Sequence, residues 1–243
     1  LARRVAIRTA SQDPASGPEL RRYLVDEMAP SLAALGFACT VHDNPEPAYG
    51  PLLIATRVED PALPTVLMYG HGDVIRGQDA SWTCGQGPWT VAADGDRLYG
   101  RGTADNKGQH SVNIAALAQV IAARRAAGQG LGFNVKFLVE TGEETGSPGL
   151  AETCAREREA LFADALIASD GPRLTRHRPT LFLGTRGVAN FDLTLKLREG
   201  AHHSGNWGGL LANPGTILAN AIASMVDARG RILVEALRPP PIP

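Results

Sequence analysis

The chain has 243 residues, of which 44% are hydrophobic and 20% charged, and its formal net charge is -1. This composition is typical of an ordinary globular protein with a sizeable core, and the length suits one large domain or one and a half typical ones. Because no polybasic stretch is present, we expect neither nucleic acid nor a membrane as a partner.

The three cysteines Cys39, Cys84 and Cys154 lie far apart, show no C-x-x-C spacing and leave an odd count. This pattern argues against a secreted disulfide framework and predicts reduced thiols in a cytoplasmic protein. We find no apolar stretch of about 18 residues and no charged-then-apolar leader, so we expect neither a transmembrane helix nor a signal peptide. The first residue is Leu1 rather than Met, which leaves open that a preceding segment was removed.

The first predicted element is an amphipathic helix over Glu19–Leu35. Six apolar side chains recur there on one helical face and predict a helix that covers one face of a sheet: Leu20, Tyr23, Leu24, Met28, Leu32 and Leu35. Turn-rich segments follow at 43–51 and 76–97, and the second ends in a hairpin-like D-G-D-R-L-Y-G-R-G sequence.

Three short apolar runs, 66–69, 135–139 and 165–168, are typical of buried strands, although periodicity alone leaves buried helix open. Each run leads into histidine or acidic residues, which we list in order: His71 and Asp73, Glu143 and Glu144, and Asp170. In open α/β sheets ligands bind at the carboxyl ends of the strands. The pattern therefore predicts that these side chains form one site.

Asp105 belongs to a different kind of segment, G-R-G-T-A-D-N-K-G at 100–108. Six residues recur at helical spacing after it, so we expect Asp105 in a loop just before a helix: Val112, Ala115, Ala116, Gln119, Val120 and Ala123. An alternative is that Asp105 only caps this helix. The glycines do not form a phosphate loop, because Lys107-Gly108 reverses the order that such a loop requires.

The pattern changes from Arg178 onward. Alternating hydrophobicity over 188–198 predicts a strand with one buried face, and Asn213-Pro214 predicts the start of a helix. We therefore place a domain boundary near 172–180, with a catalytic domain at 1–177 and a smaller unit at 178–243. That unit has too few elements to bury two faces, so we expect the chain to end within its second domain.

Imidazole and carboxylate ligands together favour zinc, although cobalt and manganese accept similar ligands. In G-H-G-D, the side chains of His71 and Asp73 point the same way along an extended segment, so Asp73 can orient the imidazole. Glu143 and Glu144 diverge if their loop is extended, so that one coordinates metal while the other acts as general base.

Five motifs in order resemble those of the dinuclear zinc exopeptidase and amidohydrolase family, which includes carnosinase-type dipeptidases, aminoacylase and carboxypeptidase G. They are G-H-G-D, G-R-G-T-A-D-N-K-G, G-E-E-T-G-S, S-D-G and A-H-H-S-G-N-W-G-G. The resemblance covers most of the chain. It implies an α/β fold with a mixed, mostly parallel sheet between helices, and part of a smaller α+β lid and dimerisation domain.

By this resemblance two zinc ions share Asp105, with His71 and Asp170 on the first ion and Glu144 on the second. Glu143 is then the general base, and a cis peptide bond follows Asp105. The resemblance also implies that His203 reaches the active site of the other subunit of a homodimer and helps to hold the oxyanion.

The second ion lacks a ligand that the family supplies from a histidine near the C-terminus, and no matching segment is present. His110, His177 and His202 lie in no matching motif. The activity of this piece is therefore in question.

The substrate implied by the resemblance is a small peptide. The H-S-G-N-W-G-G segment and Asn213-Pro214 are most similar to the carnosinase-type branch, which indicates a dipeptidase. Two alternatives stay open: an amidohydrolase acting on N-acyl amino acids, and a non-catalytic fragment that keeps the fold.

Overall fold

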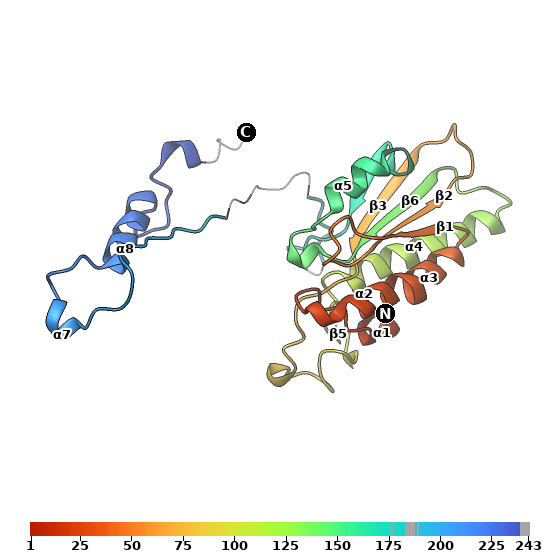
Figure 1. Cartoon of the computed structure of the whole chain (residues 1–243). Coiled ribbons are helices and arrows are strands. Elements are labelled where there is room, and N and C mark those ends of the chain that lie inside the picture. The colour runs from red at the N-terminus through yellow and green to blue at the C-terminus, as the bar shows by residue number, and fades with distance from the viewer. Residues whose placement is uncertain (176, 183–187, 189, 239–243) are drawn as a thin grey trace. The chain divides into compact units, whose positions relative to one another are not determined.

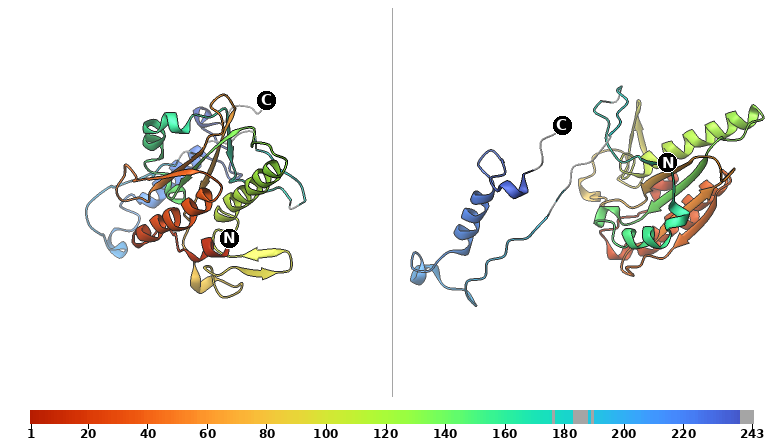
Figure 2. Two further views of the ribbon diagram at one scale, coloured as in Figure 1. Left: turned by 90° about the vertical axis from the view of Figure 1, so that its right-hand side faces the viewer. Right: turned by 90° about the horizontal axis from the view of Figure 1, so that it is seen from above.

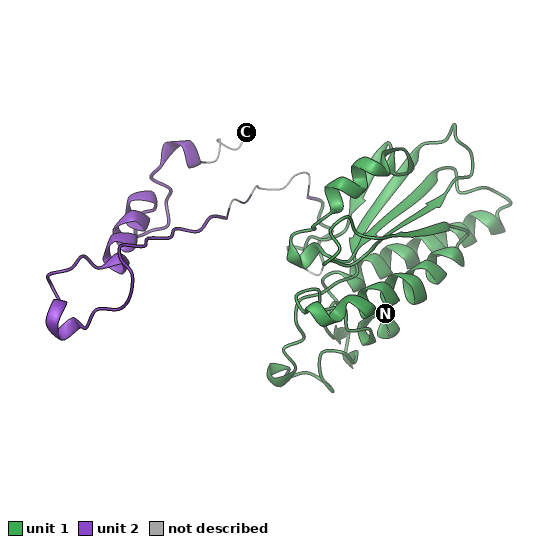
Figure 3. Cartoon of the chain, in the orientation of Figure 1, with its two compact units in different colours: residues 1–181 green, residues 182–243 purple. Residues whose placement is uncertain are grey.

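The computed structural model describes residues 1–175, 177–182, 188 and 190–238. The chain divides into two compact units, Leu1–Leu181 and Phe182–Pro243 (Figure 3). None of the helices in the described part is both long enough and apolar enough to cross a membrane. The three cysteines are free thiols.

A five-stranded sheet forms the centre of the first unit (Figure 1). In spatial order its strands are β1 (Ala38–His42), β2 (Leu52–Arg57), β6 (Asn134–Glu140), β3 (Thr65–His71) and β7 (Ala165–Ala168). The strand β3 is parallel to both β6 and β7, whereas β2 is antiparallel to its neighbours β1 and β6. The predicted mixed, mostly parallel sheet is confirmed.

Helices cover both faces of this sheet, as predicted (Figures 1 and 2). The α-helices of the first unit are α1 (Ala2–Ala6), α2 (Gly17–Arg22), α3 (Ala29–Ala33), α4 (Lys107–Ala126), α5 (Leu150–Arg156) and α6 (Arg158–Leu161). Short 3-10 turns occur at η1 (Pro14–Ser16), η3 (Asp79–Ser81) and η4 (Glu143–Thr145), and β4 (Ala92–Asp94) pairs with β5 (Arg97–Tyr99) as a hairpin. The larger core cluster packs α3 and α4 against one face, and a smaller cluster packs Leu150 and Leu161 against the other.

The predicted N-terminal amphipathic helix is present but is not a regular α-helix throughout. Between α2 and α3 the backbone takes a π-helical form at η2 (Tyr23–Met28). Pro30, the second residue of α3, has no N–H to donate, so the regular bonding pattern cannot continue through this turn. Tyr23, Leu24 and Met28 nevertheless face the core and are fully buried.

The helix after Asp105 is confirmed as α4, but its buried face is not the one with the predicted spacing. Ile114, Leu117 and Ile121 pack into the core, whereas Val112 is 67% exposed. The helix itself carries alanines on several sides, so the periodicity of its sequence alone does not define one apolar face. At the start of this helix Lys107 is buried as well, and its ammonium donates to the carbonyl oxygens of Arg4 and Ile7 at 2.9 and 2.7 Å.

The second unit contains α7 (Ser204–Trp207), α8 (Pro214–Met225) and a 3-10 turn η5 (Glu235–Leu237). Asn213 caps α8 by accepting hydrogen bonds from the N–H groups of Gly215 and Thr216, as predicted. The predicted strand over 188–198 is wrong: residues 188 and 190–198 form no strand, and residue 189 lies outside the described residues. A strand needs a hydrogen-bonded neighbour, and the described part of this unit holds no second strand to supply one.

Candidate metal centre

The sheet register brings three of the predicted motifs to one edge. His71 is paired with Glu140 at the ends of β3 and β6, and Tyr69 is paired with Ala168 of β7. The chain therefore leaves three adjacent parallel strands at the same level, and the motif residues follow within a few positions.

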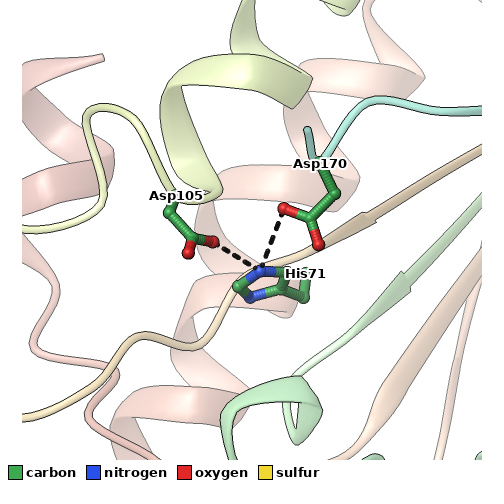
Figure 4. A group of neighbouring side chains, drawn as sticks. All are labelled: His71, Asp105 and Asp170. Carbon is green, nitrogen blue, oxygen red and sulfur yellow. Dashed lines mark hydrogen bonds and ion pairs between the residues drawn. The ribbon is translucent and has the colours of Figure 1, made fainter. Parts of the chain in front are cut away.

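His71, Asp105 and Asp170 converge around one ring nitrogen (Figure 4). His71 Nε2 lies 2.9 Å from Asp105 Oδ1 and 3.6 Å from Asp170 Oδ1. One ligand atom from each of the three residues lies within 4.8 Å of the other two. Glu143 is close to the same point, because its Oε2 lies 3.8 Å from His71 Nε2.

Asp73 is completely buried and contacts both the histidine and the glutamate loop. His71 Nδ1 lies 3.0 Å from the main-chain carbonyl oxygen of Asp73 and 3.3 Å from its carboxylate, so the ring N–H is shared between them. The same carboxylate accepts the N–H groups of Glu143 and Glu144 at 3.2 and 3.1 Å. With Nδ1 occupied in this way, Nε2 is the nitrogen left for a metal ion.

Glu143 and Glu144 lie in the 3-10 turn η4, so the extended loop expected for them is wrong. The turn forms because Gly142 and Gly146 flank it and Gly146 adopts a left-handed backbone with φ of 91°, which closes the loop. Glu143 comes near His71 Nε2, whereas Glu144 is not part of the three-residue ligand group.

The electrostatics of this edge fit a bound cation. Burial lowers the pKa of His71, but hydrogen bonds to Asp170 and Asp73 outweigh it and raise the pKa to about 11. Burial, together with neighbouring carboxylates, raises the pKa of both Glu143 and Glu144. The crowded carboxylates therefore favour a positive charge at their centre, and the nitrogen and oxygen donors suit zinc or a similar ion.

A cis peptide bond joins Asp105 to Asn106, as the resemblance implied. Asn106 itself is a site residue that the sequence analysis missed. Its side-chain N–H groups donate to Asp170 Oδ1 and to the main-chain oxygen of Ser169, both at 2.7 Å, and its oxygen accepts the N–H of His71 at 3.3 Å. Its position directly after Asp105 was the only available signal.

The other histidines considered make different contacts. His110 is buried, and both its ring nitrogens contact protein groups, so it is no spare ligand. His203 belongs to the second unit and caps α7, where its Nδ1 accepts the N–H of Gly205 at 3.0 Å. His202 packs edge-on against Trp207, and His177 is exposed.

Comparison with known proteins identifies a family for this chain. Residues 67–230 match the model of peptidase family M20/M25/M40. The chain is 38% identical over 190 residues to the Beta-Ala-His dipeptidase of Mus musculus and 32% identical over 255 residues to the Cys-Gly metallodipeptidase DUG1 of Candida albicans. The crystal structure of human carnosine dipeptidase 1 superposes with a TM-score of 0.71 at 29% identity.

These matches cover most of this chain but only part of each relative. The mouse match takes in 77% of this chain and 37% of that enzyme, and the Candida match 98% and 50%. The human structure matches 97% of this chain and 50% of its own. The family model spans well over half of the residues, including every motif from the end of β3 to α8. The chain therefore belongs to peptidase family M20/M25/M40.

Proposed function

We propose that the protein hydrolyses the peptide bond of a dipeptide with the help of two divalent metal ions. The observation that carries the proposal is the convergence of His71, Asp105 and Asp170 with Glu143 beside them. Two of its relatives are named as dipeptidases, one for Beta-Ala-His and one for Cys-Gly, which supports a small peptide as substrate.

His71, Asp105 and Asp170 would hold the first ion, and Asp105 and Glu144 would hold the second. Zinc suits this mixture of imidazole and carboxylate best, and cobalt or manganese would accept the same ligands. Bound ions of this kind polarise a scissile carbonyl and lower the pKa of water.

Glu143 is the proposed general base. Its carboxylate faces the ligand group, 3.8 Å from His71 Nε2, and its side chain is 37% exposed, so water reaches it. Burial raises its pKa above the ordinary value of 4.5, which suits a group that takes a proton and then releases it. Glu143 accepts the proton of the attacking water at its carboxylate and returns it to the nitrogen of the leaving amine.

His203 is proposed to act across a homodimer. Because Nδ1 accepts the N–H of Gly205, the ring proton of the neutral imidazole lies on Nε2, where it can be donated to an oxyanion. Exposed apolar side chains of the second unit support a subunit contact there, among them Leu210, Ile217 and Ile222. Sedimentation velocity tests this contact, and a purely monomeric chain at all concentrations would contradict it.

The function is tested with chelator-stripped protein to which zinc is restored. A free dipeptide and its N-acylated counterpart are compared as substrates, with Glu143→Gln as the inactive control. We expect zinc-dependent cleavage of the free dipeptide. Faster cleavage of the acylated compound would instead indicate an N-acyl-amino-acid amidohydrolase, and cleavage of neither would contradict the proposal for this chain.

A further inference from the structure

A buried chain of hydrogen bonds leads from the hydrophobic core to the ligand group. The hydroxyl of Tyr23 lies 2.5 Å from His110 Nε2, and His110 Nδ1 lies 3.1 Å from Asn106 Oδ1. Asn106 Nδ2 then reaches Asp170 Oδ1 at 2.7 Å. Tyr23, His110 and Asn106 are at most 1% exposed, so water does not compete for these contacts.

The orientation of the Asn106 amide fixes the direction of every bond in this chain. Its Nδ2 faces the main-chain carbonyl oxygen of Ser169, which can only accept, so the amide oxygen must point the other way. That oxygen accepts the N–H of His71 and one further proton, which His110 supplies from Nδ1. Both donors and both lone pairs of the amide are therefore in use.

The same reasoning sets the tautomer of His110. Burial lowers the pKa of His110 well below its ordinary value, so the imidazole is neutral and carries one proton. With that proton on Nδ1, Nε2 accepts from the hydroxyl of Tyr23. The other tautomer would set a lone pair of Nδ1 against the amide oxygen of Asn106, both of them buried.

Two close approaches show how tightly this cluster packs behind the metal ligands. A Cβ at Gly70 would lie 2.9 Å from Asn106 Oδ1 and 3.1 Å from His110 Cβ. A Cβ at Gly72 would lie 2.5 Å from the ring of Tyr23. The strand that ends in His71 and the glycine after it therefore lie directly against the network.

We propose that His110 is a positioning residue for the metal site. Together with the carbonyl oxygen of Ser169, its Nδ1–H holds the Asn106 amide in the orientation that directs an N–H at Asp170 and an oxygen at the main chain of His71. Tyr23 in turn fixes the imidazole ring. The inference rests on the proposed function, because it assigns these residues to the metal ligands of that same site.

Two substitutions at one position separate this role from simple core packing. The amide of His110→Asn can place an N–H near the position of Nδ1 but does not reach Tyr23. The amide of His110→Gln reaches Tyr23 but offers no donor at Nδ1. Partners behind metal ligands typically contribute 10–100-fold to affinity, so we expect His110→Gln to weaken zinc binding by about tenfold or more and His110→Asn by clearly less.

Zinc affinity is measured by competition with a chromophoric chelator, and the melting temperature of each variant is recorded. Ile114→Val serves as the control, because Ile114 is buried on the same helix and has no polar contact with the network. We expect this control to bind zinc like the unaltered chain. Equal zinc affinity in the two His110 variants, or affinities that follow melting temperature across all variants, would overturn the inference.

NMR of the imidazole nitrogens gives a second result that needs no substitution. Long-range proton–nitrogen correlations of the unaltered chain report which nitrogen of His110 carries the proton, and we expect Nδ1. A proton on Nε2, or on both nitrogens, would overturn the inference and leave the proposed function intact. A chain that binds no zinc at all would contradict the proposed function, and the inference with it.

Discussion

At the level of single residues, the buried carboxylate of Asp73 holds several parts of the site in place. It contacts the imidazole of His71, accepts the main-chain N–H groups of Glu143 and Glu144, and accepts the hydroxyl of Ser11 at 2.6 Å. Hydrogen bonds to an ionised acceptor are about twice as strong as neutral ones. Asp73 therefore joins the end of β3 to the loop that carries the proposed base.

Replacing Asp73 with Asn should weaken metal binding without removing any ligand. The amide of Asn keeps one acceptor oxygen. Its N–H group, however, would face either the main-chain N–H groups of Glu143 and Glu144 or the ring N–H of His71. We expect zinc affinity to fall by about 10–100-fold, as for other partners of metal ligands. Chelator competition measures the change, with Ser11→Ala as a milder control because it removes only one of the four contacts. Unaltered affinity in Asp73→Asn would contradict this account.

Replacing Glu143 with Gln should abolish hydrolysis and spare the metal. The amide keeps the size of the side chain but cannot accept a proton from water. General acid–base catalysis contributes about 10²–10⁴-fold, so we expect the turnover number to fall by at least that factor. Metal content, measured by atomic emission, should stay nearly unchanged. Turnover at the original rate would remove Glu143 from the role of base.

At the level of elements, ion pairs and a hydrogen bond join the N-terminal helix α1 to η2 and to α4. Glu27 of η2 accepts from Arg3 Nε at 3.1 Å and from Arg4 Nε at 3.2 Å. Arg4 also donates to Ser111 Oγ of α4 at 2.6 Å. These contacts hold the first turn of α4, and with it Asn106 and His110, against the rest of the first unit.

The contribution of Glu27 should depend on pH. Burial alone would raise its pKa, but the hydrogen bonds from Arg3 and Arg4 outweigh burial and lower the pKa below the ordinary value of 4.5. A lowered carboxyl pKa stabilises the fold above the ordinary value, and this stabilisation is lost as the pH falls through the lowered one. Glu27→Gln should therefore be less stable than the unaltered chain near neutral pH, and the difference should shrink in acid.

Urea unfolding near neutral pH and at a pH well below 4.5 measures this difference. Asp26→Asn is the matched control, because Asp26 is the exposed neighbour and the change in charge is the same. We expect Asp26→Asn to show little difference at either pH. A deficit for Glu27→Gln that is the same at both pH values would show that its charge is not responsible.

At the level of the whole molecule, all proposed metal ligands belong to the first unit, Leu1–Leu181. They come from four segments that are distant in sequence and adjacent at the sheet edge. Binding of an ion to these groups links the segments only when the unit is folded. Metal and folding should therefore be coupled.

Zinc should raise the melting temperature of the metal-free chain. A ligand present at 100 times its dissociation constant, and bound only by the folded state, adds about 2.7 kcal/mol to the free energy of unfolding. Differential scanning calorimetry with and without zinc measures the effect, and a chelator should reverse it. Asp105→Ala, which removes the proposed shared ligand, should abolish most of the shift. A melting temperature that zinc leaves unchanged would contradict the metal site.

The sequence by itself determined which segments become strands or a helix and that a site motif adjoins each of them. The runs before His71, Glu143 and Asp170 are strands of one sheet, and the helix after Asp105 begins at Lys107. These elements follow from local periodicity and from turn and capping residues, which act over a few positions. The same local signal was insufficient at 188–198, because alternation marks a strand only if a neighbour pairs with it.

Only the tertiary structure decided which side chains meet. Asn106, His110 and Tyr23 form one network because α4 and η2 pack on the same face of the sheet, and no spacing in the sequence links Tyr23 with His110. The path of the chain also brought Glu143, rather than Glu144, close to His71 Nε2. Contacts of this kind depend on how elements rotate and dock against one another. Side chains from all elements of the unit must fill the core together, and local sequence patterns do not specify how they fit.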